Sequence, residues 1–538
     1  MRGLPALRGM KHPGGHGCVG RKAHGNGPPR FRLPGGRPLP TLRPPPMRAY
    51  LLTSALLLVS CNVGTESKPP PSTRLVYPSG LAFWRPEAGP STNGYLYVAS
   101  ANFDKCYDSG SVVALDLDAV GVRSFGTDFD PGESLPNDVT SLGIGAQSYV
   151  QIQSFAGEMA LWSPPGRPPR LFVPARAEGS LLHAIDVGDD GLSLSCVQGG
   201  ERDCRVNALS LLDVPGASNG LPSAPGPLGV SVAGNGEDAR VWVTHTELAG
   251  PPTTFTEADL AGYVLHLPAA NPTRDALNTS EFVALGTNGR LSGVAHATAI
   301  GSRYVYASGR NSSSAQMGAL PARFILRLVD RTVAGRVLET DLELSYSVRE
   351  ARGVAVVPSA TRVPDPASPE LTIVDERVYL LARGPDTLLI LDVLNAAGTA
   401  PDAGTTPSVR IVSALPVPAG ASELEVIPRG PGRGNLVAVT GSGDEAVAIF
   451  DEEVGQLVAQ VQVGDNDPNQ PSQPFGLAAD VRGNSARIFT STFGDGRVAI
   501  IDIPDLDRPQ NARLVARLGA RQGRDPRQGT SLCQETSP

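Results

Sequence analysis

The sequence is short of several features, and each shortage limits what the chain can be. Lysine supplies only 4 of the 46 basic residues, a bias that we attribute to high-G+C codon usage rather than to binding. After position 61 no apolar run approaches the ~20 residues of a transmembrane helix. No stretch keeps a 3.6-residue period, so helices should be few. The motifs HExxH, GxSxG and GxxxxGK[ST] are also absent, which removes the commonest sequence signals for catalysis.

Acidic residues are missing from the first 60 positions. Residues 1–46 hold nine Lys/Arg and no apolar period. This segment is either a real basic extension, disordered because it cannot bury enough apolar surface, or a stretch that precedes the true start at Met47. We favour the second interpretation, because a long basic preface makes a poor start for a secretion signal.

A secretion signal is expected at 47–60. Met47 and Arg48 precede the apolar stretch 51–60, and small residues follow before a cleavage point. The sequence Leu58-Val59-Ser60-Cys61 resembles the lipobox of bacterial lipoproteins. That resemblance implies that Cys61 becomes the first residue of the mature protein and carries acyl chains. Residues 61–74 are polar and Pro-rich, which predicts a tether.

The resemblance also predicts location. Asn62 stands at the second mature position, where an Asp would retain enterobacterial lipoproteins in the inner membrane. We therefore expect the chain to be lipid-anchored to the cell envelope, at the outer membrane, on its periplasmic face or at the cell surface.

The mature chain is strongly acidic. Residues 61–538 hold 36 Lys/Arg against 53 Asp/Glu, a net charge of −17, compared with −7 for the whole sequence. Nucleic-acid binding needs clustered positive charge, so we expect no nucleic-acid partner.

Four further cysteines remain in the mature chain, an even number that predicts disulfides in an oxidising compartment. Cys196 and Cys204 flank a polar, Gly-containing loop that can bring them together. By elimination we predict that Cys106 pairs with Cys533. Zinc is the alternative, but no CxxC pair or nearby histidine supports it.

One supersecondary pattern recurs seven times between 75 and 519. A short β-rich strand, a polar turn and a second apolar strand form each unit, as in the pairs that begin YLYVAS (95–100), RLFVPARA (170–177), RVWVTH (240–245), RYVYAS (303–308), RVYLLA (377–382), NLVAVT (435–440) and RIFTST (487–492). Such runs, bounded by turn residues, are the signal for strands and hairpins.

A second phrase precedes most units. It has the form of PSGLAF (78–83), PLGVSV (227–232), LSGVAH (291–296), ARGVAV (351–356) and PFGLAA (474–479), with looser versions SFAGEMAL (154–161) and ASELEV (421–426). Glycine followed by small apolar residues suits an innermost strand, where backbones converge.

These phrases together resemble the YVTN-type and lactonase-like seven-bladed β-propellers. The resemblance implies an all-β fold of four-stranded antiparallel blades over 75–519, with 520–538 as a C-terminal tail. Long inter-strand loops are expected in blades 3–5. Because the last blade must meet the first, we predict that a Cys106–Cys533 disulfide closes the ring.

Candidates for chemistry are few. His183, His245 and His266 fall on predicted middle strands, where structural roles are expected. The acidic loop groups Asp128, Asp130 and Glu133, and Asp465 and Asp467, offer the oxygen ligands that Ca²⁺ prefers, although solvated turns are the favoured interpretation. Predicted inner strands carry His296, Glu423, Glu425 and Asp480, which are candidates for the central channel. The strand-ending Asp116, Asp186, Asp392, Asp451 and Asp502 are expected to accept backbone N–H bonds.

The sequence favours a non-catalytic binding or scaffolding module, without a cofactor, that contacts an envelope protein, peptide or glycan through its long loops. The alternative is a lactonase-like or other metal-dependent hydrolase that uses the channel. A quinone-cofactor dehydrogenase is disfavoured, since only Trp84, Trp162 and Trp242 are present and tryptophan-rich repeats are missing.

Overall fold

The computed structural model describes residues 68–521 apart from several short segments. Those left undescribed are 87–90, 125–134, 178, 199–201, 219, 250–261, 287–292, 311–324, 341, 343–349, 359–363, 366–367, 373, 395, 397–406 and 431. Strands dominate the described residues, as expected, and the helical elements there are short. None of these helices has the length and apolar character needed to cross a membrane.

Each of the seven sequence units forms a group of antiparallel strands. Unit 1 comprises β1 (Pro78–Trp84), β2 (Tyr95–Ser100), β3 (Gly110–Asp116) and β5 (Tyr149–Ile152), and unit 2 comprises β6 (Ala160–Trp162), β7 (Arg170–Ala175), β8 (Leu181–Val187), β9 (Leu194–Cys196) and β10 (Leu209–Ser210). Unit 3 comprises β11 (Pro227–Ala233), β12 (Arg240–His245), β13 (Tyr263–Pro268) and β14 (Phe282–Ala284). Unit 4 comprises β15 (Val294–Ile300), β16 (Tyr304–Arg310), β17 (Leu326–Asp330) and β18 (Val337–Glu339).

The remaining three units follow the same plan. Unit 5 comprises β19 (Glu350–Pro358), β22 (Val374–Arg383), β23 (Thr387–Leu394) and β24 (Ser408–Pro416). Unit 6 comprises β25 (Ala421–Ile427), β26 (Leu436–Gly441), β27 (Ala446–Asp451) and β28 (Gln456–Gln462). Unit 7 comprises β29 (Pro474–Arg482), β30 (Ser485–Thr492), β31 (Arg497–Ile503) and β32 (Arg513–Leu518). A small hairpin of β20 (Pro364–Asp365) and β21 (Ser368–Thr372) lies outside the units.

Units 4 and 5 are joined into one eight-stranded sheet, so the sheets are not seven separate ones. The join is a single pair, Arg310 of β16 with Glu350 of β19. The other five units form separate sheets of four or five strands. The observed architecture is therefore all-β and propeller-like, with five separate sheets and one joined sheet.

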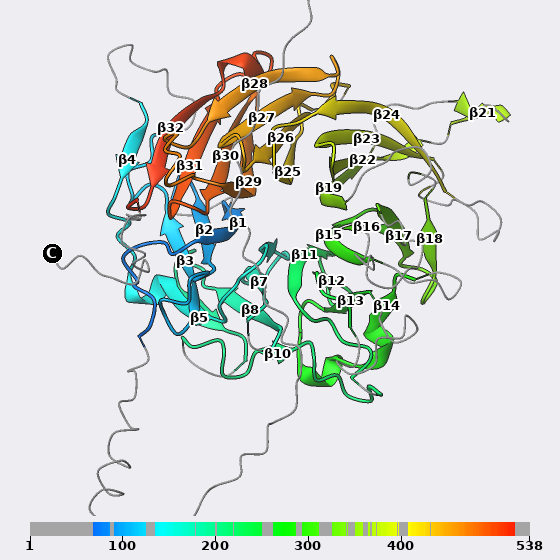
Figure 1. The fold of residues 1–538 in the computed structure, drawn as a ribbon, viewed down its shortest axis with the longest axis horizontal. Helices are drawn as coiled ribbons and strands as arrows, with labels where there is room; N and C mark the ends of the chain where they lie inside the picture. Colours follow the sequence, from blue (N-terminus) through cyan, green and yellow to red (C-terminus); the bar gives the residue numbers. More distant parts are fainter. Residues whose placement is uncertain are drawn as a thin grey trace, which may run out of the picture. The chain divides into compact units, whose positions relative to one another are not determined.

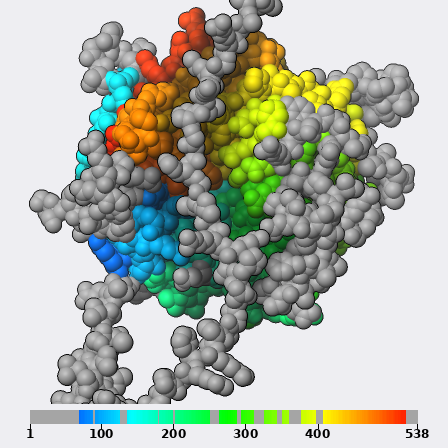
Figure 2. Space-filling view, in the orientation of Figure 1, coloured from blue at the N-terminus to red at the C-terminus, as the bar shows by residue number. Residues whose placement is uncertain are grey.

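The first strands of the units follow one another around a common centre. We call β1, β6, β11, β15, β19, β25 and β29 the inner strands. Each contacts the inner strand of the next unit, and β29 contacts β1. Figure 1 shows β1, β11, β15, β19, β25 and β29 facing the centre, and in Figure 2 the described segments follow one another in chain order, with the last sheet beside the first.

Seven clusters of buried apolar side chains hold this arrangement together. Each cluster is made of residues from two neighbouring units, and one of them joins unit 7 to unit 1. Because a twisted sheet cannot bury both faces alone, its stability depends on the sheets on either side. Hydrophobic burial therefore lies between units rather than within them.

The recurring glycine phrase forms a β-bulge on the inner strand. Six inner strands shift register against their second strand at the same position, and Gly80, Gly229, Gly353 and Gly476 lie in four of these bulges. A Cβ atom on Gly229 would stand 2.3 Å from the carbonyl oxygen of His296 in the next unit. Glycine is thus required where two backbones approach closely.

In unit 4 the glycine of the phrase LSGVAH does not lie in the bulge. It lies at His296 and Ala297, between the paired residues Ala295 and Thr298, and Gly293 precedes the strand. The small residue Ala297 takes the place of the glycine there.

Hydroxyl groups tie neighbouring units together at the bulges. Thr244 Oγ1 donates to the carbonyl oxygen of His296 at 2.7 Å, and Ser491 Oγ donates to that of Ser79 at 2.9 Å. The second of these bonds links unit 7 to unit 1, so the ring closes with the same contact that joins other units.

A strand from unit 1 adds to the closure. β4 (Asn137–Val139) lies between β3 and β5 in the sequence, but it pairs in parallel with β32 at the outer edge of unit 7. The N–H of Gly519 also donates to Val139 O at 2.9 Å. The sequence did not predict this exchange of a strand.

Part of the expected tether lies against the body. Arg74 Nη2 donates to Tyr107 Oη at 2.6 Å, and Tyr149 Oη donates to Pro70 O at 3.1 Å. Residues 68–74 are therefore fixed to unit 1. The predicted signal, Cys61 and Cys533 lie outside the described residues, so the lipid anchor and the Cys106–Cys533 bond stay predictions.

Candidate functional site

Three of the four predicted channel candidates lie at the centre of the ring near one end. This end, which we call the entry end, is where the inner strands begin and the second strands finish. His296 lies on β15, while Glu423 and Glu425 lie on β25. Asp480 lies near the finish of β29 and forms ion pairs with Arg482 at 2.6 Å and Arg85 at 3.6 Å, so it is separate from the others.

A carboxyl pair joins two units that are not neighbours. The side chains of Glu158, in unit 2, and Glu423, in unit 6, share a hydrogen bond. Glu158 Oε2 also accepts the N–H of Val230 at 3.3 Å. Burial raises the pKa of Glu158 to about 7 and, together with the charge of Glu158, raises that of Glu423. One of the two must be protonated to donate, so the pair carries one negative charge at most.

Sequence reasoning did not identify Glu158, although a signal was present. Glu423 and Glu158 both stand at the second bulge position, where Gly80, Gly229 and Gly476 stand in other units. The two looser phrases, ASELEV and SFAGEMAL, are the ones that carry these glutamates. The two phrases that depart from the glycine pattern are therefore the ones that contribute the buried glutamates.

His296 is buried beside a group of arginines. Its side chain is 4% exposed and its Nε2 lies 3.9 Å from Glu350 Oε2. Neither ring nitrogen has a hydrogen-bond partner in the described part of the chain. Burial, and then the charges of four arginines, lower its pKa to about 2, so the imidazole is neutral.

These arginines, Arg176, Arg310, Arg352 and Arg383, form what we call the central arginine cluster. They come from three units: Arg176 directly follows β7, Arg310 ends β16, Arg352 lies on β19 and Arg383 ends β22. All four act electrostatically on His296. The cluster is local and unusual, because the chain as a whole is acidic.

Backbone carbonyl groups fix two of these side chains, and the carboxylate of Glu350 fixes a third. Arg383 donates to Ala421 O at 2.6 Å and to Gly420 O at 2.9 Å, and Arg310 donates to Thr246 O at 2.7 Å. Arg352 Nε donates to Glu350 Oε1 at 2.9 Å. Burial and the neighbouring Arg352 lower the pKa of Arg383, which is the response expected of cations held close together.

An aromatic cluster lies at the same end of the ring. It consists of Tyr77, Phe103, Phe155 and Phe493, from units 7, 1 and 2. The ring of Phe103 lies 5.3 Å from that of Phe155 and 5.6 Å from that of Phe493, yet Phe103 is 52% exposed. The backbone N–H of Arg176 donates to Phe155 O at 3.1 Å, so one residue of each cluster is joined through the main chain.

Arginines bind the acidic loop group of Asp465 and Asp467, the one that lies among the described residues. Burial by itself would raise the pKa of Asp465, but the hydrogen bond from Arg497 and the charges of Arg517 and Arg521 outweigh burial and lower this pKa. Asp467 pairs with Arg521 at 2.9 Å. Among the described residues no group of three or more His, Cys, Asp or Glu is placed to hold a metal. Asp128, Asp130 and Glu133 lie outside those residues.

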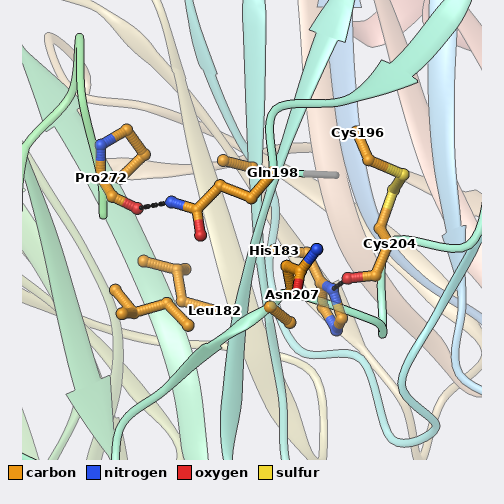
Figure 3. Close-up of a pocket in the computed structure, with 10 residues that line it drawn as sticks. Leu182, His183, Cys196, Gln198, Cys204, Asn207 and Pro272 are labelled. Atoms are coloured by element: carbon orange, nitrogen blue, oxygen red, sulfur yellow. Dashed lines mark hydrogen bonds between the residues drawn. A yellow bond between two sulfur atoms is a disulfide. The ribbon is translucent and has the colours of Figure 1, made fainter. Parts of the chain in front are cut away.

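The remaining histidines have structural contacts. A disulfide joins Cys196 to Cys204, with Cα atoms 5.2 Å apart, and a small pocket beside it contains His183 (Figure 3). His183 Nδ1 lies 3.2 Å from Cys204 O, and its Nε2 accepts Gln153 N–H at 3.0 Å. Since a carbonyl only accepts and an N–H only donates, these partners fix a neutral tautomer. His183 is buried, so its role is structural, as expected.

The strand-ending aspartates fulfil the expected turn role only in part. Asp116 and Asp451 accept backbone N–H bonds. Three others instead form an ion pair with the arginine that lies opposite them on the second strand of the unit. These pairs are Asp186 with Arg170, Asp392 with Arg377, and Asp502 with Arg487. The repeat therefore encodes a cross-strand ion pair as well as a turn.

No protein-family model and no curated protein matches the sequence. Among solved structures, the chain is similar to AztD from Citrobacter koseri, at 10% identity over 83% of this chain and 94% of that chain, with a TM-score of 0.37. It is similar to hydrazine synthase from Kuenenia stuttgartiensis, at 11% over 82% and 98%, with a TM-score of 0.41. It is also similar to virginiamycin B lyase from Staphylococcus aureus, at 10% identity over 81% of this chain and 96% of that chain, with a TM-score of 0.39. Similarities of this size do not identify a function.

Proposed function

We propose that the chain is a lipid-anchored, seven-bladed β-propeller of the bacterial cell envelope that acts as a non-catalytic binding module. Seven inter-unit cores and seven successive inner strands support this number of blades. The joined sheet is compatible with it, because a single residue pair, Arg310 with Glu350, connects its two halves.

One observation carries the binding role. The central arginine cluster gathers four cations around the buried, neutral His296, and Glu247, Glu350 and Asp386 are among the carboxylates that act on these arginines. Close cations of this kind repel each other and are stabilised by an anionic partner. A site of this composition binds, but it presents no nucleophile paired with a base within the described residues.

The partner is expected to be an envelope protein, peptide or glycan. Much of the long loops of units 3–5 lies outside the described residues, so their role in contacting it stays a prediction. The test is crosslinking and affinity capture of the anchored protein from native membranes. Specific co-purification of an envelope component, lost on replacing Arg176 and Arg352 with Gln, is expected. Capture that is unchanged in this variant contradicts the central site.

The anchor is tested separately. Cys61→Ala is expected to move the protein from the membrane fraction to the soluble fraction, because acyl chains provide the membrane affinity. A variant that stays in the membrane fraction contradicts lipidation at this residue.

A metal-dependent hydrolase is the second candidate. It would use Glu158, Glu423 and Glu425, of which the first two interact directly, although the described residues do not place three such side chains around one metal position. Lactone hydrolysis that a chelator abolishes and Ca²⁺ restores would select this function over the binding role.

A further inference from the structure

We propose that the central arginine cluster binds an amphipathic organic anion, a carboxylate or phosphate joined to an aromatic or other apolar group, whose apolar part lies on Phe103. This inference rests on the proposed binding function and specifies its ligand. The cations, a buried imidazole and an exposed aromatic ring would each contact a different part of such a ligand.

The cations provide the charge that the ligand needs. Arg352 and Arg383 are partly satisfied by Glu350, at 2.8 and 3.4 Å, so this carboxylate already marks a position that an anion can occupy. Arg176 lies across the ring from Arg352, within electrostatic reach of it. Guanidinium groups suit carboxylate and phosphate equally, because both offer paired oxygens to a planar donor.

The buried imidazole provides a donor that the fold does not use. His296 is 4% exposed, and neither of its nitrogens is hydrogen-bonded in the described residues. A neutral imidazole has one N–H and one acceptor nitrogen, and a buried polar group without a partner is costly. An oxyanion among the arginines gives this N–H an acceptor.

The carboxyl pair does not cancel the positive charge. Glu158 and Glu423 hydrogen-bond to each other and share a proton, so two glutamates contribute at most one negative charge. Glu247, Glu350 and Asp386 also act on the arginines of the cluster, so an anionic ligand competes with these carboxylates for the guanidinium groups.

The aromatic cluster selects an apolar ligand. Phe103 exposes 52% of its surface although Phe155 and Phe493 lie beside it. Lys105 Nζ lies 5.4 Å from the centre of the Phe155 ring, which adds a further cation at this edge. The backbone bond from Arg176 to Phe155 links the two clusters, and the Phe155 ring lies beside that of Phe103, so we infer that a ring attached to an anion at Arg176 can reach Phe103.

The test measures binding of four probes to the purified full chain by calorimetry: phenyl phosphate, 3-phenylpropionate, inorganic phosphate and the neutral 3-phenyl-1-propanol. We expect one-to-one binding of at least one aromatic anion, about tenfold weaker binding of inorganic phosphate, and none of the alcohol. The two aromatic anions distinguish phosphate from carboxylate. Binding should weaken with added salt.

Variants locate the binding. Arg176→Gln and Arg352→Gln should each weaken aromatic-anion binding about tenfold, while Phe103→Ala should weaken it without changing the affinity for inorganic phosphate. His296→Asn keeps an N–H donor and should retain more affinity than His296→Leu. Arg508→Gln, with a side chain 72% exposed, is the matched control. Thermal unfolding of every variant verifies folding.

Failure of this inference can be distinguished from failure of the proposed function. If no probe binds, or if the variants bind like the wild type, the ligand class is wrong, even if Arg176→Gln still abolishes capture of an envelope partner. If the aromatic anions bind at the cluster and no envelope component is captured, the ligand class holds and the scaffolding role is wrong.

Discussion

Glu158 and Glu423 hydrogen-bond to each other although 265 positions of sequence and several units of the ring separate them. Two carboxyls bond in this way only when a proton lies between them. The contact between the two carboxyls therefore requires a bound proton, and it exists only in the folded state.

The first prediction concerns pH. Burial raises the pKa of Glu158 from its ordinary value to about 7, so the folded state holds the proton more tightly than the unfolded state. This stabilisation is complete below about pH 4.5 and is lost as the pH rises through about 7. Glu158→Gln cannot ionise, so at pH 8 it should be more stable than the wild type by about 3 kcal/mol, and the difference should shrink to less than about 1 kcal/mol at pH 5.

Urea unfolding of both proteins between pH 5 and pH 8 measures this difference. His183, His245 and His296, whose pKa values burial lowers, destabilise both proteins at low pH and cancel in the comparison. Glu237→Gln, 87% exposed, is the control and should follow the wild type. Parallel profiles for Glu158→Gln and the wild type would contradict the shared proton.

The second prediction concerns the glycines at the bulges. A Cβ atom on Gly476 would lie 2.1 Å from the carbonyl oxygen of Ser79, across the junction between units 7 and 1. Backbone cannot move aside as a flexible side chain can, so Gly476→Ala should destabilise the fold by about 2–4 kcal/mol.

Gly236→Ala is the matched control for this substitution, because a Cβ atom there meets nothing within 4 Å. Its effect should stay within about 0.5 kcal/mol. Equal stability of the two variants in chemical unfolding would show that the sheets can separate at this junction without loss.

The sequence predicted the repeats better than the site, for a physical reason. Strand and turn signals are local, so the seven units and the innermost position of the glycine phrases could be found from the residues alone. The meeting of Glu158 with Glu423 depends on ring geometry, and so does the gathering of Arg176, Arg310 and Arg352. The departures from the glycine phrase were visible, but their partners were not.

The exchange of β4 was also beyond the sequence. This strand has only three residues, Asn137–Val139, and the first two are an asparagine and an aspartate, which are uncommon in strands. They form a strand because the edge of β32 offers unpaired backbone groups. Tertiary context, rather than local propensity, determines that element.

The third prediction concerns the buried ion pair of Arg487 and Asp502. The two side chains are 1% and 8% exposed and meet at 2.6 Å. Arg487→Met leaves a buried carboxylate unpaired and should cost about 3–5 kcal/mol. The double variant Arg487→Met with Asp502→Leu removes both charges and should recover most of that loss.

The exposed pair Arg274–Asp213, with side chains 64% and 66% exposed, provides the comparison. Arg274→Met should cost at most about 1 kcal/mol. Chemical unfolding of all three variants tests the argument, and a double variant as unstable as Arg487→Met alone would mean that packing, not the unpaired charge, causes the loss.

The last prediction concerns closure of the ring by a disulfide. Cys106 lies in the loop between β2 and β3 of unit 1, and Cys533 lies beyond unit 7, outside the described residues. A bond between them encloses most of the chain, so it should contribute about 2–5 kcal/mol by restricting the unfolded state. Cys533→Ser should therefore lower the melting temperature under oxidising conditions and leave it unchanged under reducing conditions. Cys196→Ser opens a loop of sequence separation 8 and should have the smaller effect. A thiol assay completes the test: Cys533→Ser should gain one free thiol, that of Cys106, and a wild type that already shows this thiol has no such bond.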